Sequence, residues 1–262
     1  MSHVASILIP LPHYGFDPTE SSVPWKKIKE AGFKITFATP EGQTASADTR
    51  MVTGVDLPRL LRGSLMAEPE AVTSYQEMAR SSEFLQPLSY DAVKQDDYDA
   101  LLLVGGHDKG MRPYLESPPL QKTVASFFTE NKVVGAICHG TLLAARSLSS
   151  NGKSVLWGRK TTGLTKKQEW IAYLLTCLWL DDYYRTYSMW MAEELISYLR
   201  APEDYSAGPG FPIPLKRDSD ADLSTGFTVR DQNYLSARWP GDAHRFANEF
   251  IQMVQEQSSK KP

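Results

Sequence analysis

Cysteine is scarce in this sequence. Its 262 residues include only two cysteines, Cys138 and Cys177. Two cysteines cannot build the disulfide framework of a small secreted domain. The N-terminus also shows neither the basic region nor the small-residue cleavage site of a signal peptide. We therefore expect a cytoplasmic protein with free thiols.

Long hydrophobic runs and an excess of one charge are also lacking. The apolar stretches at residues 5–11, 100–104, 133–137 and 171–180 are far shorter than the roughly 20 residues that cross a bilayer. Lysine and arginine number 28 against 31 acidic residues, a formal net charge of −3, which does not suit a nucleic-acid coat. A hydrophobic content of 42% excludes a disordered chain. We expect neither a membrane nor a nucleic-acid partner.

Motifs for metals and phosphates are missing as well. The sequence has no His-Glu-x-x-His and no Cys-x-x-Cys, so no spaced ligand set for a catalytic metal is found. Gly105 and Gly110 have the separation of a phosphate-binding loop, but Met111 stands where lysine is required. We expect no metal and no cofactor.

Short apolar strands that alternate with helices make up most of the chain. Strands are expected at residues 5–11, 34–39, 98–104 and 133–137, and helices at 25–31, 67–80, 120–130 and 141–148. Such strands are buried on both faces, which predicts an α/β fold with a parallel sheet whose functional loops follow the carboxyl ends of the strands. Those loops come after Leu11, Val104 and Ile137.

The pattern changes beyond Gly163. Helices are expected at residues 165–179 and 188–199, flanking an aromatic segment, and residues 202–222 are rich in Pro, Gly and Asp. We interpret this region as a helical insertion or lid. Short strands at 227–229 and 234–237 and a helix at 242–255 complete the chain.

The strand at residues 133–137 leads directly into Cys138-His139-Gly140. Small residues two before and two after the cysteine, Ala136 and Gly140, suit a nucleophile elbow, where the backbone turns sharply. A thiol at a helix N-terminus is expected to ionise below its reference pKa and to react faster than Cys177. A buried structural cysteine is the alternative.

Gly105-Gly106-His107 follows the neighbouring strand. Its backbone N–H groups would lie beside Cys138, where they could stabilise an oxyanion. A simple tight turn is the alternative.

These residues resemble the ThiJ/PfpI superfamily, through Ala-Ile-Cys-His-Gly at 136–140 and the glycine pair at 105–106. The resemblance covers nearly the whole chain. It implies a single domain over residues 1–262 with insertions at about 55–97 and 166–225. The implied architecture is a flavodoxin-like three-layer sandwich of the class I glutamine amidotransferase-like type.

The resemblance also implies site residues. The family glutamate four residues before a proline matches Glu20, before Pro24, rather than the neighbouring Asp17. One branch of the family adds an acid after a Thr-Gly-Phe-Thr-like segment, which here is Thr162-Gly-Leu-Thr165 followed by Glu169. A Cys138, His139 and Glu169 set follows, with His139 oriented by the Glu169 carboxylate.

The implied function is a cofactor-independent enzyme acting on small reactive aldehydes, as glyoxalase III does in converting methylglyoxal to lactate. A PfpI-type amidase or peptidase, and a non-enzymatic stress holdase or cysteine redox sensor, are the alternatives. Family members usually dimerise, so we expect a homodimer. Seven aromatic residues of the insertion could line a substrate entrance, although a core or subunit interface is the commoner role of such residues: Trp170, Tyr173, Trp179, Tyr183, Tyr184, Tyr187 and Trp190.

Overall fold

A seven-stranded sheet forms the centre of the computed structural model, which describes residues 4–209 and 216–259. The strand order is β5-β3-β1-β6-β7-β9-β8, and all neighbours are parallel except the antiparallel pair β8 and β9. The predicted α/β fold with a mainly parallel sheet is confirmed. The strands of this sheet are β1 (Ser6–Pro10), β3 (Lys34–Thr39), β5 (Leu88–Ser89), β6 (Ala100–Leu103), β7 (Val133–Ile137), β8 (Thr228–Asp231) and β9 (Tyr234–Ala237).

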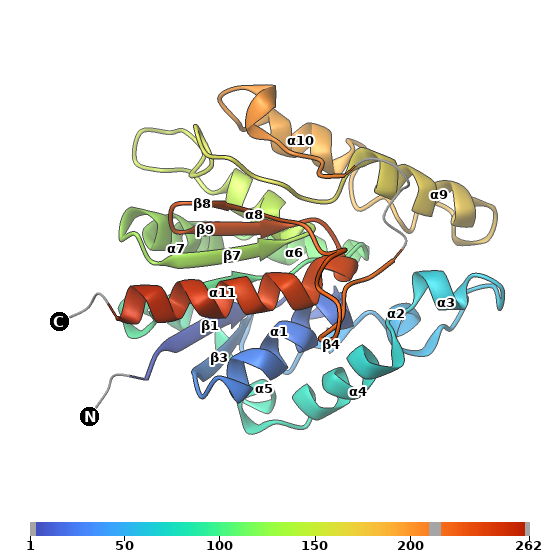
Figure 1. Ribbon diagram of the computed structural model, residues 1–262, viewed down its shortest axis with the longest axis horizontal. Helices are drawn as coiled ribbons and strands as arrows, with labels where there is room; N and C mark the ends of the chain where they lie inside the picture. Colours follow the sequence, from blue (N-terminus) through green and yellow to red (C-terminus); the bar gives the residue numbers. More distant parts are fainter. Residues whose placement is uncertain (1–3, 210–215, 260–262) are drawn as a thin grey trace.

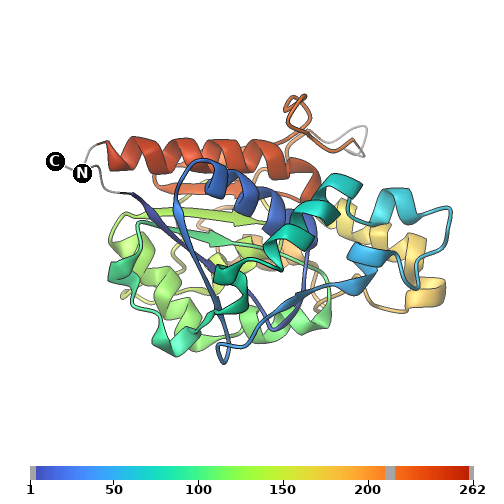
Figure 2. The same cartoon turned by 90° about the horizontal axis from the view of Figure 1, so that it is seen from below.

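Helices cover both faces of the sheet, so the fold has three layers (Figure 1, Figure 2). Helices α1 (Pro18–Glu30) and α11 (Ala243–Ser258) contact each other on one face, and α7 (Pro118–Thr129) and α8 (Gly140–Arg146) pack on the other. Every residue of β6 and β7 is buried, as expected for strands with a helical layer on each side.

The connections of the chain run to both sides of β1. From β1 the chain moves outward to β3 and β5, then returns to place β6 on the other side of β1. Open α/β sheets bind their ligands outside the carboxyl ends of the strands at such a switch point. Here that point lies between β1 and β6, next to β7.

Helix α1 begins earlier than the expected start at Trp25. Asp17 caps it, accepting hydrogen bonds from the backbone N–H groups of Thr19 at 2.7 Å and Glu20 at 3.0 Å. Pro18 occupies the first turn, and Pro24 lies inside the helix. The expected start at Trp25 is therefore wrong, because an aspartate N-cap with a following proline is the stronger start signal.

A second, smaller sheet and further helices complete the described structure. A two-stranded sheet of β2 (Tyr14–Phe16) and β4 (Ser46–Ala47) was not expected from the sequence. The remaining helices are α2 (Thr49–Thr53), α3 (Arg62–Leu65), α4 (Pro69–Met78), α5 (Ser82–Leu85), α6 (Arg112–Leu115), α9 (Lys166–Leu180) and α10 (Met191–Ser197), with 3-10 turns at Tyr90–Ala92, Gln95–Asp97, Lys109–Met111, Pro202–Asp204 and Pro240–Asp242.

A small second hydrophobic cluster joins the two regions that were expected to be insertions. Met51 and Leu57 pack there against Tyr183 and Tyr184, and α9 adds Ala172 among its neighbours. Part of the Pro/Gly/Asp-rich stretch, residues 210–215, lies outside the described residues. Among the helices of residues 4–209 and 216–259, none is both long and apolar enough to cross a bilayer. The single-domain boundaries and the insertion limits stay predictions.

Candidate active site

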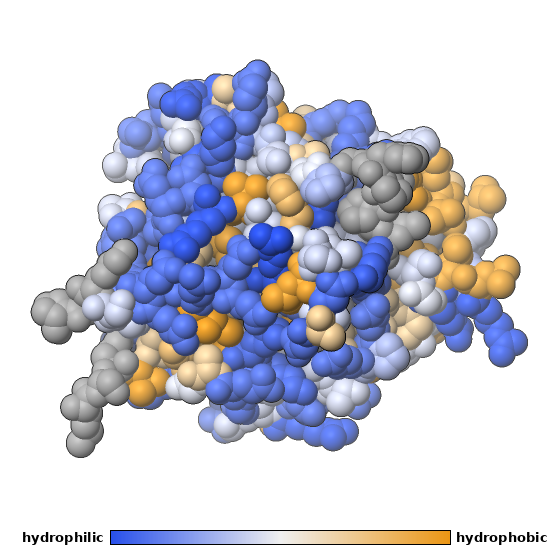
Figure 3. All heavy atoms as spheres, in the orientation of Figure 1, coloured by the Kyte–Doolittle hydropathy of each residue, from blue (hydrophilic) through white to orange (hydrophobic). Residues whose placement is uncertain are grey.

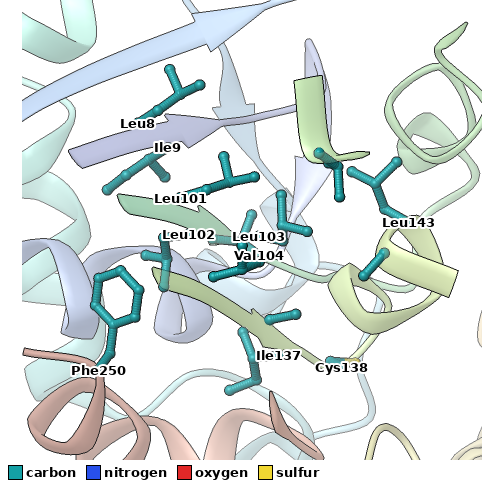
Figure 4. Close-up of a cluster of buried hydrophobic side chains, with 14 of the residues drawn as sticks. Leu8, Ile9, Leu101, Leu102, Leu103, Val104, Ile137, Cys138, Leu143 and Phe250 are labelled. Carbon is teal, nitrogen blue, oxygen red and sulfur yellow. The ribbon is translucent and has the colours of Figure 1, made fainter. Parts of the chain in front are cut away.

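The nucleophile elbow expected at Cys138 is present between β7 and α8. Cys138 has a φ of 54°, a left-handed conformation that costs a non-glycine residue about 1–3 kcal/mol. The Cys138 carbonyl accepts a hydrogen bond from the Thr141 backbone N–H at 3.1 Å. A Cβ atom on Gly140 would lie 2.3 Å from the Leu103 carbonyl oxygen, so only glycine fits. Figure 4 shows Cys138 just beyond Ile137, at the end of β7.

Glu20 reaches the elbow from the first turn of α1. Its Oε2 atom accepts a hydrogen bond from the Gly105 backbone N–H at 3.0 Å, and its Oε1 atom is buried with no hydrogen-bond partner among the described residues. Glu20 Oε2 and Cys138 Cβ lie 2.6 Å and 2.7 Å from the point that a Cβ atom on Gly105 would occupy. The two side chains are therefore neighbours, as expected, although 118 positions separate them in sequence. Asp17, which we did not match to the family glutamate, caps the helix and so fixes where Glu20 points.

Burial controls the protonation of this pair. Glu20 and Cys138 are both 0% exposed. Burial, followed by the charge of Asp17, raises the pKa of Glu20 well above its usual value. Burial, followed by the charges of Glu20 and Asp17, raises the pKa of the Cys138 thiol, although the His139 backbone N–H favours the thiolate. The expectation of a lowered thiol pKa is wrong, because burial disfavours the thiolate and the neighbouring Glu20 and Asp17 add to that effect.

Two imidazole rings complete the polar surroundings of the sulfur. His139 Nδ1 lies 3.5 Å from Cys138 Sγ, and the His107 ring stands edge-on to the His139 ring with centroids 5.3 Å apart. Burial lowers the pKa of His107 to about 4 and that of His139 well below its usual value. Both rings are therefore neutral at physiological pH, so His139 can accept a proton.

The same three side chains form a metal-binding geometry. Ligand atoms of His107, Cys138 and His139 all lie within 4.8 Å of one another, and neutral imidazole and thiolate are ligands of Zn²⁺ and Cu⁺. Sequence spacing does not reveal these three residues as a group, because His107 follows β6 whereas Cys138 and His139 follow β7. A catalytic cysteine–histidine pair produces the same proximity.

The glycine loop after β6 lies against the elbow. A Cβ atom on Gly105 would lie 2.6 Å from Glu20 Oε2 and 2.7 Å from Cys138 Cβ. A Cβ atom on Gly106 would lie 2.5 Å from the Gly15 carbonyl oxygen. The Gly105 N–H is occupied by Glu20, so it is not free to bind an oxyanion. The oxyanion role of Gly106 and the substrate contact of His107 stay predictions.

Glu169 does not contact His139. The structure buries it at 1% exposure, but its Oε2 accepts a hydrogen bond from the Met191 backbone N–H at 2.9 Å, and its Oε1 lies 3.8 Å from Arg185 Nε. Among the described residues, no hydrogen bond joins Glu169 to His139, so that expectation is wrong. Thr165 caps α9 and sets the start of the helix, which directs Glu169 toward the segment before α10. A catalytic role of Glu169 stays a prediction.

A cavity of about 130 Å³ lies beside the site. His107 lines it, together with Tyr184, Ile171 and Leu175, so its surface is largely apolar. Arg217 also lines it, and the Nη1 atom of this residue is buried with no hydrogen-bond partner in the described structure. No motif marks Arg217 in the sequence, because it lies within the Pro/Gly/Asp-rich stretch. The cavity is a small apolar chamber that reaches the site at His107, whose ring packs against His139.

The aromatic residues of the insertion include some that are buried near the site and others that are exposed on α9. Tyr184 packs edge-on against His107, with ring centroids 5.1 Å apart, and Tyr183 is buried beside it. Trp170 and Trp179 are each 47% exposed on α9. Only Tyr184 of this set lines the cavity.

Comparison with known proteins places the chain among related sequences and folds. The family model described as ThiJ/PfpI family-like matches residues 11–209. An uncharacterized protein of Schizosaccharomyces pombe is 27% identical over 147 residues, 53% of either chain. The glutathione-independent glyoxalase hsp3102 of the same yeast is 25% identical over 156 residues, 58% of this chain and 60% of the relative. The chain thus matches a little over half the length of these curated relatives.

The fold is shared with a solved glyoxalase III from Candida albicans. That structure superposes with a TM-score of 0.69, covering 97% of this chain and 98% of the other, at 20% sequence identity. At this identity the likeness shows the fold alone.

Proposed function

The chain belongs to the ThiJ/PfpI-like family, and from that premise we propose that it is a cysteine-dependent enzyme that converts small 2-oxoaldehydes to 2-hydroxy acids, with methylglyoxal giving lactate. One observation carries the proposal: the buried Cys138 thiol, at a sharp strand-to-helix turn, lies 3.5 Å from His139 Nδ1 and beside the Glu20 carboxyl group. The names of two similar proteins, a glutathione-independent glyoxalase and a glyoxalase III, support this choice among the family's activities.

The reaction begins with addition of the thiol to the aldehyde. At rest the thiol keeps its proton, since burial raises its pKa. As sulfur bonds to the aldehyde carbon, the thiol proton passes to His139 Nδ1, 3.5 Å away, and from there to the carbonyl oxygen. The product is a neutral hemithioacetal, so this step leaves no negative charge on sulfur or oxygen in the buried site beside Glu20 and Asp17. The neutral state of His139 is what allows it to accept the proton.

A proton shift and a hydrolysis complete the conversion. A base, His139 or Glu20, removes the proton from the hemithioacetal carbon and returns it to the adjacent ketone carbon through an enediol. The former aldehyde carbon is thereby oxidised to a thioester and the ketone is reduced to an alcohol. Water then attacks the thioester, which releases the 2-hydroxy acid and restores the thiol. The overall balance is one 2-oxoaldehyde plus one water to one 2-hydroxy acid.

Cysteine oxidation is the second candidate function. The Glu20 carboxyl group, kept protonated by burial, is positioned to donate a hydrogen bond to an oxygen on the Cys138 sulfur. Two peroxide molecules would take the thiol through sulfenic acid to sulfinate, each releasing one water. The same contact would therefore suit a redox sensor.

A substrate screen separates these functions. Purified protein and the Cys138→Ser variant are incubated with methylglyoxal and phenylglyoxal, and with amides and short peptides, without glutathione. Proposed activity appears as 2-hydroxy acid formation by the parent protein and at least about a 10²-fold loss in the variant. Cleavage of amides or peptides alone would show a PfpI-type hydrolase instead.

The redox alternative has its own readout. Intact-mass measurement after peroxide treatment would show a gain of two oxygens at Cys138 in a protein that turns over none of the substrates. Absence of both turnover and oxidation would overturn both candidates and favour a holdase.

A further inference from the structure

Four residues that line the cavity beside His107 each carry a buried polar atom with no hydrogen-bond partner among the described residues. These atoms are Gln168 Nε2, Tyr184 Oη, Arg217 Nη1 and Trp239 Nε1. The three nitrogen atoms can only donate a hydrogen bond. Burial raises the pKa of Tyr184, so its hydroxyl group also keeps a proton to donate. Leaving buried donors unpaired is costly, and this set therefore indicates a ligand that brings acceptor oxygens.

Neighbouring groups hold two of these side chains so that a donor is left over. Gln168 Oε1 accepts hydrogen bonds from the backbone N–H and the hydroxyl group of Thr165, at 3.2 Å and 2.8 Å. The amide nitrogen is therefore the unpaired end of Gln168. Arg217 Nη2 donates to the carbonyl oxygens of Met66 at 2.8 Å and Ser64 at 3.3 Å, which leaves Nη1 without a partner in the described structure.

Arg217 also gives the cavity a positive charge. Its hydrogen bonds go to backbone carbonyl groups, which are neutral, and among the described residues no carboxylate is bonded to it. Asp17 is the acid among the lining residues, and its negative charge would oppose an anion. Burial is the largest influence on Asp17 and raises its pKa, which narrows the pH range over which it is charged. The charge of Arg217 therefore favours an anionic ligand.

The rest of the cavity is apolar and small. Leu164, Ile171 and Leu175 line it, and Leu175 is 42% exposed, so the wall that α9 provides lies near the surface. Figure 3 shows hydrophobic residues gathered over the part of the surface where Figure 1 places α9 and α3, two helices that line the cavity. The cavity volume is about 130 Å³. Because a cavity of about 150 Å³ holds benzene, a ligand of about six non-hydrogen atoms fits.

We propose that this cavity binds a small apolar carboxylate, such as butanoate, whose oxygen atoms accept hydrogen bonds from Arg217 and Tyr184. Arginine pairs with carboxylates through charge-assisted hydrogen bonds, which are stronger than neutral ones. The alkyl chain lies against the leucine and isoleucine side chains of the wall. Cys138 is not one of the described residues that line the cavity, so this site is separate from the proposed reaction and can be tested by binding alone.

Isothermal titration calorimetry at neutral pH tests the class of ligand. Butanoate should bind at one site with a dissociation constant of about 1 mM, which is reasonable for a ligand of this size. Butanamide has nearly the same shape without the charge and should bind at least about tenfold more weakly. Lactate should also bind more weakly than butanoate, because its hydroxyl group would be buried against the apolar wall.

Two neighbouring tyrosines provide a matched pair of variants. The Tyr184 hydroxyl group has no partner in the described structure, so Tyr184→Phe should leave the melting temperature nearly unchanged but weaken butanoate binding about tenfold. The Tyr183 hydroxyl group donates a hydrogen bond to Asp48, and Tyr183 is not one of the lining residues. Tyr183→Phe should therefore lower the melting temperature and leave binding nearly unchanged.

Replacement of arginine tests the charge. Arg217→Gln should weaken butanoate binding about tenfold or more and should remove the preference for butanoate over butanamide. Arg230→Gln is the control, because it changes an arginine of β8 that pairs with Glu256 instead of lining the cavity. Melting curves show whether both variants are folded.

Several results would overturn the proposal. These are no binding of butanoate, equal binding of butanoate and butanamide, and folded Tyr184→Phe and Arg217→Gln variants that bind like the parent protein. Tighter binding of lactate than of butanoate would contradict an apolar ligand and would assign the cavity to the product of the proposed reaction instead.

Discussion

At the scale of single residues, the site depends on three buried acidic groups that each keep their protons to a higher pH than usual. Cys138, Glu20 and Asp17 are each buried, and burial raises the pKa of all three. Negative charges in such proximity oppose one another. The resting thiol is therefore neutral. Its reactivity depends on transfer of its proton to a nearby acceptor such as His139 Nδ1, because little thiolate is present at rest.

Replacing Glu20 with glutamine should make the thiol easier to ionise. The glutamine oxygen can still accept the hydrogen bond from Gly105, while the carboxyl charge that raises the pKa of Cys138 is removed. We expect the pKa of Cys138 to fall. The iodoacetamide reaction rate as a function of pH, measured in a Cys177→Ser background, checks this. An unchanged pH profile would show that Glu20 does not act on the sulfur.

At the scale of secondary-structure elements, Glu169 links the start of α9 to the start of α10. Its carboxyl group accepts a hydrogen bond from Met191, the first residue of α10, and burial raises its pKa to about 7. Glu169 therefore connects α9 to α10 through this hydrogen bond and does not bond to His139.

The raised pKa of Glu169 predicts how stability depends on pH. In the unfolded chain the carboxyl group loses its proton near its reference pKa of 4.5, whereas in the folded protein it keeps the proton until about pH 7. Stability therefore falls as pH rises from about 4.5 to about 7, by up to about 3 kcal/mol from this group. Urea unfolding of the parent protein and Glu169→Gln, at pH 5 and pH 8, measures it.

We expect Glu169→Gln to lose less stability than the parent protein between these two pH values. Glu193→Gln changes an exposed carboxyl group nearby whose charge makes the smallest contribution to the raised pKa of Glu169, so this comparison variant should stay closer to the parent than Glu169→Gln does. Turnover of a 2-oxoaldehyde by Glu169→Gln addresses the remaining catalytic prediction: a loss of roughly 10²–10⁴-fold would indicate acid–base participation, whereas a small loss would indicate a structural link alone.

At the scale of the whole molecule, the site exists because three separate segments meet at one glycine. Gly105 follows β6, Glu20 comes from α1, and Cys138 and His139 follow β7. A Cβ atom on Gly105 would lie within 2.7 Å of atoms from each of the other two segments. The parallel sheet brings these segments together by aligning the carboxyl ends of its strands.

Gly105→Ala should therefore disrupt the site while the rest of the fold forms. Overpacking in a tight interior typically costs about 1–3 kcal/mol, and the displaced Glu20 should reduce turnover strongly. Gly63→Ala is the matched control, because a Cβ atom there has nothing within 4 Å, and it should leave stability and turnover nearly unchanged. Equal behaviour of the two variants in thermal melts and turnover assays would contradict this packing.

Local patterns in the sequence determined several strands of the sheet and the turn at Cys138. Lys34–Thr39, Val133–Ile137 and Tyr234–Ala237 form strands with the expected bounds, since β-branched and aliphatic runs between turns are local signals. The cysteine elbow was readable for the same reason: small residues flank Cys138 within five positions. The contact of Glu20 with Cys138 followed from family likeness and the order of a parallel sheet.

Only the tertiary structure decided the protonation of the site and the partners of its acids. The pKa of Cys138 rises because the thiol is buried and because Glu20 and Asp17 lie near it, and burial is a property of packing that no short motif records. Glu169 bonds to Met191 because of how α9 and α10 are placed, and Arg217 lines the cavity from a segment with no motif. Sequence signals are local, whereas desolvation and long-range hydrogen bonds arise only when distant segments meet.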